Sequence, residues 1–392
     1  MKSKPAFASL MILCAAALAL PAAAQTQTPL KIGFLAEMSG IYGAPGQDQY
    51  DAFMMFVEAH GGKLGGVPVQ VIKEDTQFKP DVANQIVDRL MERDGVQLFT
   101  GITYSHIMMA VHKKITEKED FLVSSNTGPA PIAGEKCSPF FFSTAFQNDQ
   151  LSEVVGKFAV ERGYKRIFAL APNYQAGKDF IAGFKRTYKS PLLDEVYTPL
   201  SQQDFSAEIA QIQAAKPDAV YVFYPGGLGV NFVKQYAQAG LRSIPLLNTA
   251  TTEGINLPAQ GESAAGAMNG SFWGPDFKNP ASQKFVADFE ARYKRIPSQY
   301  AAQSYDAAQL LDSALAKVKG SIADKKAFQA ALKAADFNSV RGEFKFGNNN
   351  FPIQDMHIFE AYKDPQGRMN VKTIATPMKA VRDSYADQCP LK

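Results

Sequence analysis

Short apolar runs alternate along this chain with longer segments in which apolar residues recur every three or four positions. The first pattern predicts buried strands and the second predicts amphipathic helices. Strands are expected at 32–36, 67–72, 96–100, 121–125, 166–171, 219–224 and 244–247, and helices at 81–93, 105–116, 151–162, 178–188, 208–215 and 230–239. This alternation is typical of parallel sheets that carry helices on both faces. Because the series restarts near residue 151, we predict an α/β protein with two Rossmann-like lobes.

The last quarter of the chain departs from this alternation. It predicts three consecutive helices at 282–293, 300–318 and 325–335, followed by strands at 342–346, 357–362 and 371–375. Strands that complete the sheets so late require the chain to cross between the lobes more than once. Residues 143–147 are not Gly/Ser-rich, so the first crossing is expected to be ordered rather than a flexible linker.

The first predicted strand leads into a glycine loop. The stretch KIGFLAEMSGIYGAPGQDQYDAF, residues 31–53, places Gly40, Gly43 and Gly46 between a strand and a helix. Backbone N–H groups at such a junction usually face an anion. The spacing G-x-x-G-x-x-G differs from the dinucleotide pattern G-x-G-x-x-G, so this loop predicts no nucleotide cofactor.

Motifs for catalysis are missing from the sequence. It contains neither G-x-x-x-x-G-K nor G-x-S-x-G, and its four histidines form no H-E-x-x-H. His106 and His112 lie six positions apart and do not share a helix face. Scattered cysteines cannot build a zinc ribbon. We therefore expect no enzyme activity, no metal site and no cofactor.

Hydroxyl, amide and aromatic side chains recur instead where predicted strands stop. Ligands of open parallel sheets bind outside the carboxyl ends of the strands. Any single loop of this kind is also explained by helix capping or turn formation, for which Ser, Thr, Asn and Gly are favoured. Six such loops in two lobes favour a ligand cleft. The candidate ligand-binding residues at these loops are Tyr42, Tyr104, Ser105, Asn126, Thr127, Tyr174, Tyr224, Asn248 and Thr249, and Trp273 is added as an aromatic residue near the predicted cleft.

The N-terminal residues predict export. Lys2 and Lys4 precede an apolar stretch at 7–20 and small residues at 22–24, which is the pattern of a secretory signal peptide. Cleavage is expected after Ala24, and the lack of a small residue before Cys14 argues against a lipid anchor. Removing residues 1–24 takes away two lysines and no acid, so the formal net charge falls from +3 to +1. That charge gives no electrostatic case for nucleic-acid or membrane binding.

Two cysteines, Cys137 and Cys389, remain after residues 1–24 are removed. An even number of cysteines in an oxidising compartment favours pairing. Two unrelated thiols are the alternative. We expect a Cys137–Cys389 disulfide.

From Lys31 to Tyr362 the chain resembles the periplasmic leucine/isoleucine/valine-binding protein family. The resemblance lies in an ordered series of stretches: KIGFLAEMSGIYGAPGQDQYDAF, VIKEDTQFKPDVANQIVDRLMERDGVQLFTG, FAVERGYKRIFALAPNYQAGKDF, DFSAEIAQIQAAKPDAVYVF and KQYAQAGLRSIPLL. It implies the type 1 periplasmic binding fold, with crossovers near Ala145, Trp273 and Phe351. The lobes it implies are residues 28–144 with 274–351, and residues 145–273 with 352–392.

The same resemblance implies a function in transport. Members of this family are the solute-binding components of bacterial ABC importers. A periplasmic monomer is therefore expected, which binds one small molecule between its lobes without catalysis. An inner-membrane permease then recognises the closed form.

The resemblance also assigns roles within the cleft. Ser105 and Thr127 match the hydroxyl positions that hold the α-carboxylate in amino-acid-binding members, with Asn126 beside them, and Tyr42 matches an aromatic wall. An acid of the second lobe usually meets the α-ammonium, but the matching position is about Ala250, and Glu253 lies three residues further on. An ammonium group buried without a carboxylate is costly.

Aromatic residues near the predicted cleft suit a flat ring that carries one carboxylate. An aromatic carboxylate, such as a benzoate or a phenylpropenoate, is therefore the leading ligand class. Branched-chain or other amino acids come next, if Glu253 turns inward, and short amides or other carboxylates follow. Two alternatives belong to other classes of protein. One is a ligand-sensing domain for a receptor or regulator, but no signalling segment is expected after the fold. The other is a secreted enzyme, but no catalytic motif is present.

Overall fold

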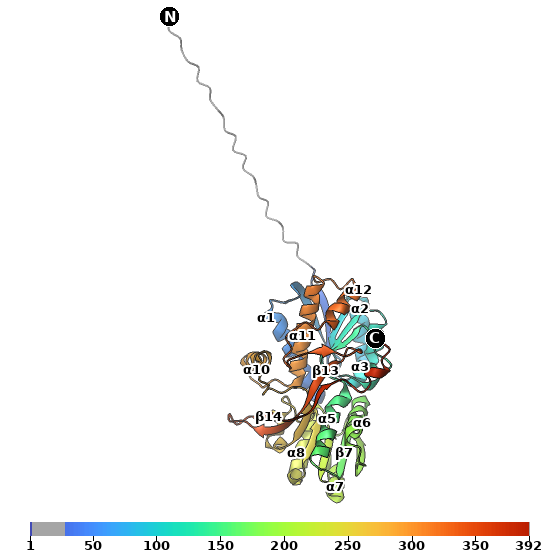
Figure 1. Cartoon of the computed structure of the whole chain (residues 1–392), viewed down its shortest axis with the longest axis vertical. Coiled ribbons are helices and arrows are strands. Elements are labelled where there is room, and N and C mark those ends of the chain that lie inside the picture. The colour runs from blue at the N-terminus through green and yellow to red at the C-terminus, as the bar shows by residue number, and fades with distance from the viewer. Residues whose placement is uncertain (2–27, 392) are drawn as a thin grey trace.

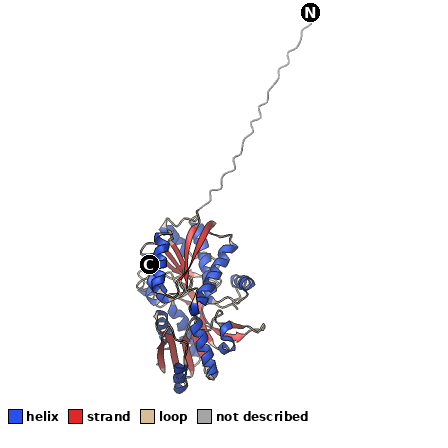
Figure 2. Cartoon of the chain, turned by 180° about the vertical axis from the view of Figure 1, so that it is seen from behind, coloured by secondary structure: helices blue, strands red, loops and turns tan. Residues whose placement is uncertain are grey.

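The computed structural model describes Met1 and residues 28–391. Except for Met1, the predicted signal peptide at 1–24 lies outside the described residues. Figure 1 shows two lobes stacked along the long axis, one built from the blue and cyan segments with two orange helices, the other from the green and yellow segments. We call these the first lobe and the second lobe. Each contains a sheet between helices (Figure 2), so the predicted α/β architecture with two lobes is confirmed.

The first lobe contains a six-stranded sheet. Its strand order is β2 (Lys63–Leu64), β3 (Val67–Asp75), β1 (Leu30–Ala36), β4 (Leu98–Gly101), β5 (Phe121–Ser124) and β6 (Phe141–Ser143). All neighbours pair in parallel except β2 and β3. Strands β4 to β6 are buried along their whole length, as expected for parallel strands that are covered on both faces.

The second lobe contains an eight-stranded mixed sheet. Its order is β12 (Lys345–Phe346), β13 (Pro352–Lys363), β11 (Met268–Ser271), β10 (Leu246–Thr249), β9 (Ala219–Phe223), β7 (Ile167–Pro172) and β8 (Asp194–Thr198), with β14 (Met369–Val381) paired to β13. Strands β7 to β11 pair in parallel, whereas β13 pairs antiparallel with its neighbours.

Helices cover both sheets. In the first lobe these are α1 (Gly43–Ala59), α2 (Pro80–Glu92), α3 (Ser105–Thr116), α4 (Ala130–Ala133), α11 (Gln299–Lys317) and α12 (Lys325–Lys333). In the second lobe they are α5 (Asn148–Glu161), α6 (Gln175–Tyr188), α7 (Ser206–Ala215), α8 (Gly226–Gln238) and α9 (Leu257–Gln260). Helix α10 (Pro280–Tyr293) and the 3-10 turns η1 (Gly40–Tyr42), η2 (Leu241–Ser243), η3 (Gly261–Ala264) and η4 (Ala386–Gln388) complete the set. Apolar spacing explains the helix faces: α2 buries Ala83, Ile86, Val87 and Leu90, one stripe of a 3.6-residue period.

The chain passes between the sheets three times. It leaves the first sheet after β6, returns after β11 so that α11 packs on α1, and enters the second sheet again at β12 and β13. The short strand β12, which falls in a segment predicted for the first lobe, pairs with β13. The lobe boundaries at 144/145, 273/274 and 351/352 stay predictions.

The glycine loop after β1 has a packing role. A Cβ atom at Gly46 would overlap the carbonyl oxygen of Glu37, so glycine allows α1 to begin directly against the end of β1. Ile41, on η1, instead reaches the second lobe, where it approaches Gly226 and Gly227 at the start of α8.

Candidate ligand-binding site

The carboxyl ends of strands from both sheets meet at one buried cavity between the lobes. The residues that line it follow β4, β5 and β6 in the first sheet and β7, β9 and β10 in the second. They are Thr103, Tyr104, Ser105, Asn126, Thr127, Phe146, Asn148, Tyr174, Ala176, Phe180, Phe223, Pro225 and Ala250, with Tyr300 from α11. This is the edge at which open parallel sheets bind ligands.

The two lobes are closed over this cavity. The free volume between its side chains is about 20 Å³, which is room for about one water molecule. Contacts between the lobes seal it: the Tyr42 hydroxyl donates to the carbonyl oxygen of Leu200, and the Ala130 N–H donates to Asp179 Oδ2 at 3.2 Å. A larger ligand can therefore enter only when the lobes move apart.

One part of the cavity is lined by hydrogen-bonding groups. The hydroxyls of Ser105 and Thr127 are bonded to each other, and Asn148 Nδ2 donates to Ser105 Oγ at 3.0 Å. Ser105 is also the first residue of α3, so the N–H groups there have no partners within the helix and carry its positive dipole end. Asn126 is held in place by Gln303, whose Nε2 donates to Asn126 Oδ1 at 2.6 Å. These groups suit an anion.

Aromatic rings form much of the remaining lining. The rings of Tyr174 and Phe223 are nearly parallel, with centroids 6.1 Å apart, and Phe180 packs against Phe223 at 4.2 Å. Phe146 comes from the crossover after β6, and Tyr300 from α11. Rings from both lobes thus face one cavity.

Among the described residues, the lining contains no acidic or basic side chain. Ala250 lies in the lining, but Glu253 faces a separate hollow beside Ser271 and Trp273. Glu253 accepts a hydrogen bond from Gln299 Nε2, and burial raises the pKa of Glu253 to about 8. A carboxyl group that is neutral and outside the cavity supplies no charge to an ammonium group within it.

The structure brings together half of the candidate residues predicted from the sequence. Those that line the cavity are Tyr104, Ser105, Asn126, Thr127 and Tyr174. Tyr42 lies one layer behind, stacked on Phe78 at 4.0 Å and in edge contact with Tyr104.

Four further candidates point into the protein interior. Tyr224 accepts a hydrogen bond from Thr198 Oγ1 at 3.1 Å. Asn248 Nδ2 donates to Thr252 Oγ1, and Thr249 Oγ1 is bonded to the Tyr221 hydroxyl. Trp273 Nε1 donates to Ser282 Oγ at 2.9 Å and borders the hollow that holds Glu253. Strand-end position alone does not tell which way these side chains turn.

Several lining residues were not predicted. Phe146 and Asn148 lie in and after the first crossover, and Tyr300 lies on α11, about 150 residues further along the chain. Phe180 is inside α6 and Phe223 is the last residue of β9, positions that the sequence pattern assigns to the core. Only the hydrogen-bonding character of Asn148 beside the predicted crossover could have signalled its role.

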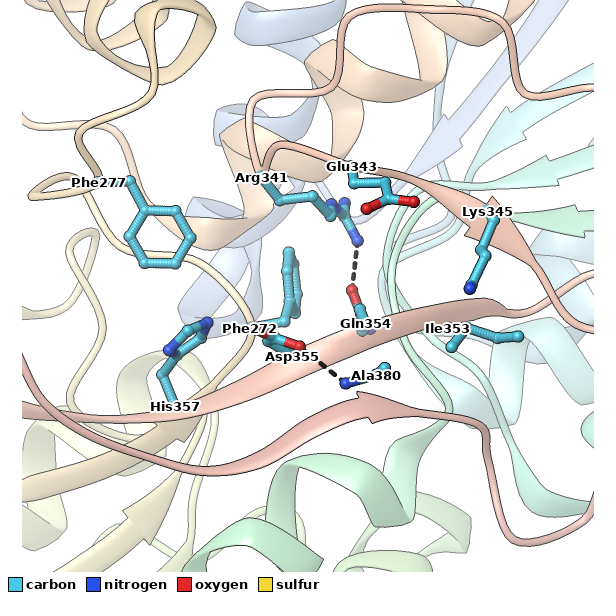
Figure 3. A pocket seen from close by; sticks show the side chains of 10 residues that line it. All are labelled: Phe272, Phe277, Arg341, Glu343, Lys345, Ile353, Gln354, Asp355, His357 and Ala380. Carbon is cyan, nitrogen blue, oxygen red and sulfur yellow. Dashed lines mark hydrogen bonds between the residues drawn. The ribbon is translucent and has the colours of Figure 1, made fainter.

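A second hollow lies at the crossovers between the lobes (Figure 3). It measures about 240 Å³, and Phe272, Phe277, Arg341, Gln354 and His357 are among its lining residues. Arg341 Nη1 donates to Gln354 Oε1 at 2.7 Å, drawn as a dashed line, and its guanidinium lies over the Phe272 ring at 4.3 Å. This hollow lies beside the strands β12 to β14 rather than at converging carboxyl ends, so we place the ligand site elsewhere.

Arg341 also ties the crossovers together. It donates to the carbonyl oxygens of Thr144 and Ala145 in the first crossover and pairs with Asp306 of α11 at 3.2 Å. Both partners are buried, so removing either charge leaves the other unpaired in the interior.

The predicted disulfide is present. Cys137 follows α4 in the first lobe and Cys389 lies near the C-terminus, with Cα atoms 5.7 Å apart. Figure 1 accordingly places the C-terminus beside the first lobe, near α3.

Within the described part of the chain, no group of three or more His, Cys, Asp or Glu side chains could hold a metal ion. None of the described helices combines the length and the apolar character that a membrane crossing needs.

Comparison with known proteins supports the same fold. The curated "Leu/Ile/Val-binding protein homolog 6" of Brucella melitensis is 26% identical over 375 residues, which cover 92% of this chain and 95% of that protein. A crystal structure of an ABC transporter solute-binding protein from R. palustris in complex with benzoate is 31% identical, with a TM-score of 0.88, over 93% of this chain and 100% of that one. A further solute-binding protein of an ABC transporter, from Rhodopseudomonas palustris and in complex with 3,4-dihydroxybenzoic acid, is 26% identical with a TM-score of 0.83, over 91% and 99% of the chains.

The family profile described as "Periplasmic binding protein" matches residues 29–366. This match and the Leu/Ile/Val-binding relatives confirm the resemblance that the sequence stretches indicated. Since the matched region spans most of the sequence and both lobes, the chain belongs to the periplasmic binding protein family.

Proposed function

We propose that this ABC-type solute-binding protein captures a ring carboxylate, such as a benzoate or a phenylpropenoate, and delivers it to a membrane permease. The observation that carries the proposal is the composition of the cavity between the lobes. It combines hydroxyl and amide groups at the start of a helix with a set of aromatic rings and, within the described residues, no charged side chain.

The carboxylate of the ligand binds at Ser105 and Thr127. Ser105 Oγ accepts a hydrogen bond from Asn148, so the one hydroxyl hydrogen of Ser105 can be donated only to Thr127 or to the ligand. Either Ser105 or Thr127 then has a hydroxyl hydrogen left for the ligand, and the first N–H groups of α3 add further donors. Hydrogen bonds of this kind to a charged group contribute about 1.5–3 kcal/mol each.

The ring of the ligand packs among Phe146, Tyr174, Phe180 and Phe223. Aromatic pairs prefer offset or edge contacts and contribute about 0.5–1.5 kcal/mol beyond simple burial. These rings belong to the second lobe and to the first crossover, whereas Ser105 and Thr127 belong to the first lobe, so a bound ring carboxylate is held by both lobes at once. Such contacts shift the population towards the closed arrangement.

The relatives support a ring carboxylate as the ligand. The R. palustris protein with 31% identity was crystallised with benzoate, and the one with 26% identity was crystallised with 3,4-dihydroxybenzoic acid. The curated relatives carry the name Leu/Ile/Val-binding protein homologue, which makes a branched-chain amino acid the second candidate.

The surroundings of Glu253 argue against an amino acid. Its carboxyl group borders the hollow of Trp273 rather than the cavity. An α-ammonium group in the cavity would therefore lack a charged partner among the described lining residues, which costs several kcal/mol.

Binding assays on the purified mature protein test the proposal. Benzoate and cinnamate are expected to bind with micromolar Kd or better, about −8 kcal/mol, and leucine is not expected to bind. A ligand at about 100 times its Kd adds about 2.7 kcal/mol to the free energy of unfolding, so a thermal-shift screen followed by calorimetry suffices. Strong stabilisation by leucine, with no response to the ring acids, would refute the proposal. In that case Glu253→Gln should abolish leucine binding.

The location follows from the same proposal. The family is periplasmic, and we propose that export depends on a signal peptide cleaved after Ala24. We also propose that the lobes move as units with the predicted boundaries at 144/145, 273/274 and 351/352.

A further inference from the structure

The chain after β14, residues 382–391, contacts both lobes, and we call it the C-terminal strap. We propose that the C-terminal strap, anchored covalently by the Cys137–Cys389 disulfide, holds the two lobes in the closed arrangement and thereby slows ligand release. The consequence for ligand release rests on the proposed function, whereas the effect on lobe closure does not.

The attachment to the first lobe is covalent and buried. Cys389 is joined to Cys137, just after α4. Asp383 Oδ2 accepts a hydrogen bond from Asn349 Nδ2 at 2.9 Å, and the same amide group donates to the carbonyl oxygen of Ala133 at 2.7 Å. Ala386, within η4, is completely buried.

The attachment to the second lobe depends on hydroxyl groups. The Tyr385 hydroxyl donates to Asp149 Oδ2 on α5 at 3.0 Å and accepts from Arg186 Nη2 on α6 at 3.0 Å. Ser384 Oγ donates to Glu153 Oε1 at 2.6 Å. Arg186 bridges the two acids, and both carboxylates are buried. These bonds can break without any change in covalent structure.

The two attachments are close together in the chain. Asp383 is held by the first lobe and Tyr385 by the second, and two residues span about 7 Å at most when extended. The adjoining surfaces of the lobes therefore cannot separate further unless one attachment gives way. If the Asp383 hydrogen bond breaks first, the disulfide still holds Cys389 on the first lobe, and the four residues from Tyr385 to Cys389 span about 14 Å at most. Wider opening must therefore break the bonds of Ser384 and Tyr385, which deprives two buried carboxylates of donors.

Both attachments also flank the ligand cavity. The segment that ends at Cys137 begins with Asn126 and Thr127 of the lining, and Asp149 directly follows the lining residue Asn148. A strap held at these points braces both walls of the cavity in their closed positions.

Small-angle X-ray scattering of the ligand-free, oxidised protein tests the effect on closure. Tyr385→Phe removes the two hydroxyl hydrogen bonds and keeps the ring, and Cys389→Ser releases the covalent anchor. Both variants are expected to show a larger radius of gyration than the wild type. Asp387→Asn is the matched control, since Asp387 pairs only with Arg382 of the strap itself among the described residues. An unchanged radius of gyration in both Tyr385→Phe and Cys389→Ser would overturn the proposal.

Stopped-flow and calorimetric titration with benzoate test the effect on release. Tyr385→Phe is expected to weaken binding three- to tenfold, mainly through faster dissociation, with no change in Asp387→Asn. Unchanged or tighter binding by Tyr385→Phe would overturn the inference while leaving the proposed function intact. A wild type that fails to bind benzoate would instead refute the proposed function, and the scattering experiment would still decide whether the strap holds the lobes closed.

Discussion

Ser105 and Thr127 depend on a third side chain for their chemistry. Asn148 Oδ1 accepts from the Gly128 N–H at 3.1 Å, while its Nδ2 donates to Ser105 and to Asp179 Oδ2 at 2.8 Å. If the Asn148 amide were flipped, its oxygen would face the Asp179 carboxylate and the two would repel each other. The Nδ2 group therefore stays on this side, and Ser105 Oγ accepts a hydrogen bond from it. The hydroxyl pair consequently presents a hydrogen to the cavity, which favours an anionic ligand.

Ser105→Ala and Thr127→Ala should each weaken benzoate binding tenfold or more, since each removes a hydrogen bond to a charged group worth about 1.5–3 kcal/mol. Isothermal titration calorimetry measures the change. Ser125→Ala is the control, because its hydroxyl is bonded to Gln49 Oε1 and it does not line the cavity. An unchanged affinity in the Ser105→Ala, Thr127→Ala double variant would rule out this carboxylate site.

Ala250→Glu should impair binding of ring acids by at least tenfold, because it introduces a carboxylate into a cavity whose described lining is uncharged. Glu253→Gln should leave benzoate affinity unchanged, since Glu253 faces another hollow. Titrating both variants with benzoate and leucine gives the comparison. The opposite pattern, with Glu253→Gln abolishing binding, would mean that Glu253 does reach the ligand.

Glu253 also makes stability depend on pH. Burial raises its pKa from the ordinary 4.5 to about 8, so the folded state holds the proton more tightly than the unfolded state. The resulting stabilisation is complete below about pH 4.5 and is lost as the pH rises to about 8, at a rate of no more than about 1.4 kcal/mol per pH unit. Glu37, with a pKa raised to about 7 by burial, acts in the same direction.

Glu253→Gln should therefore lose less stability than the wild type between pH 5 and pH 8. Thermal unfolding across this range measures the difference, with the exposed Glu161→Gln as the control. If the wild type and Glu253→Gln showed parallel curves, Glu253 would already be ionised in the folded protein.

The turn η1 of the first lobe packs against the start of α8 in the second lobe. A Cβ atom at Gly227 would lie 2.9 Å from Ile41 Cβ, and Gly226 has a positive φ of 57°. The glycines therefore let the lobes approach closely here. Gly226 is needed because its positive φ disfavours other residues, whereas Gly227 is needed because a side chain there would collide with Ile41.

Gly227→Ala should weaken benzoate binding three- to tenfold, because its methyl group meets Ile41 only when the lobes close. Calorimetry on Gly227→Ala and on Gly227→Ala combined with Ile41→Gly checks this, since removing the Ile41 side chain should restore affinity. A loss of affinity that the second substitution does not relieve would point to a local defect in α8 instead.

The elements that the sequence predicted well show either a helical period or a continuous apolar run. The helix expected at 105–116 is α3, Ser105–Thr116, and the strand expected at 121–125 is β5, Phe121–Ser124. The strands β6, β8 and β11 were not predicted. Each has three to five residues, and in β8 and β11 polar residues interrupt any apolar run.

At the scale of the whole molecule, the Cys137–Cys389 disulfide joins two residues that lie 252 positions apart in the sequence. Thiol titration of the denatured, unreduced protein should detect no free thiol in material purified from the periplasm. Reduction should lower the free energy of unfolding by up to about 5 kcal/mol in the chain-entropy treatment of a loop this long. Denaturant unfolding with and without reductant measures this difference. Two free thiols in freshly purified, unreduced protein would contradict the pairing.

The sequence by itself was sufficient to predict the α/β class, the two lobes and the cysteine pair. Periodicity and composition are properties of short stretches of sequence, so they can be recognised without a structure. It also predicted residues at the strand ends near α3, where Ser105, Asn126 and Thr127 indeed line the cavity.

Only the tertiary structure decided which of the strand-end side chains turn into the cavity. Tyr224, Asn248, Thr249 and Trp273 have the right residue types at plausible positions, yet each is bonded inside the protein. Asn148 and Tyr300 reach the cavity from the crossover and from α11, and Glu253 faces a neighbouring hollow, with its carboxyl group beside Tyr300. Side-chain direction depends on packing between segments far apart in the chain, and the closing of one lobe on the other completes the cavity; neither is encoded in any local stretch.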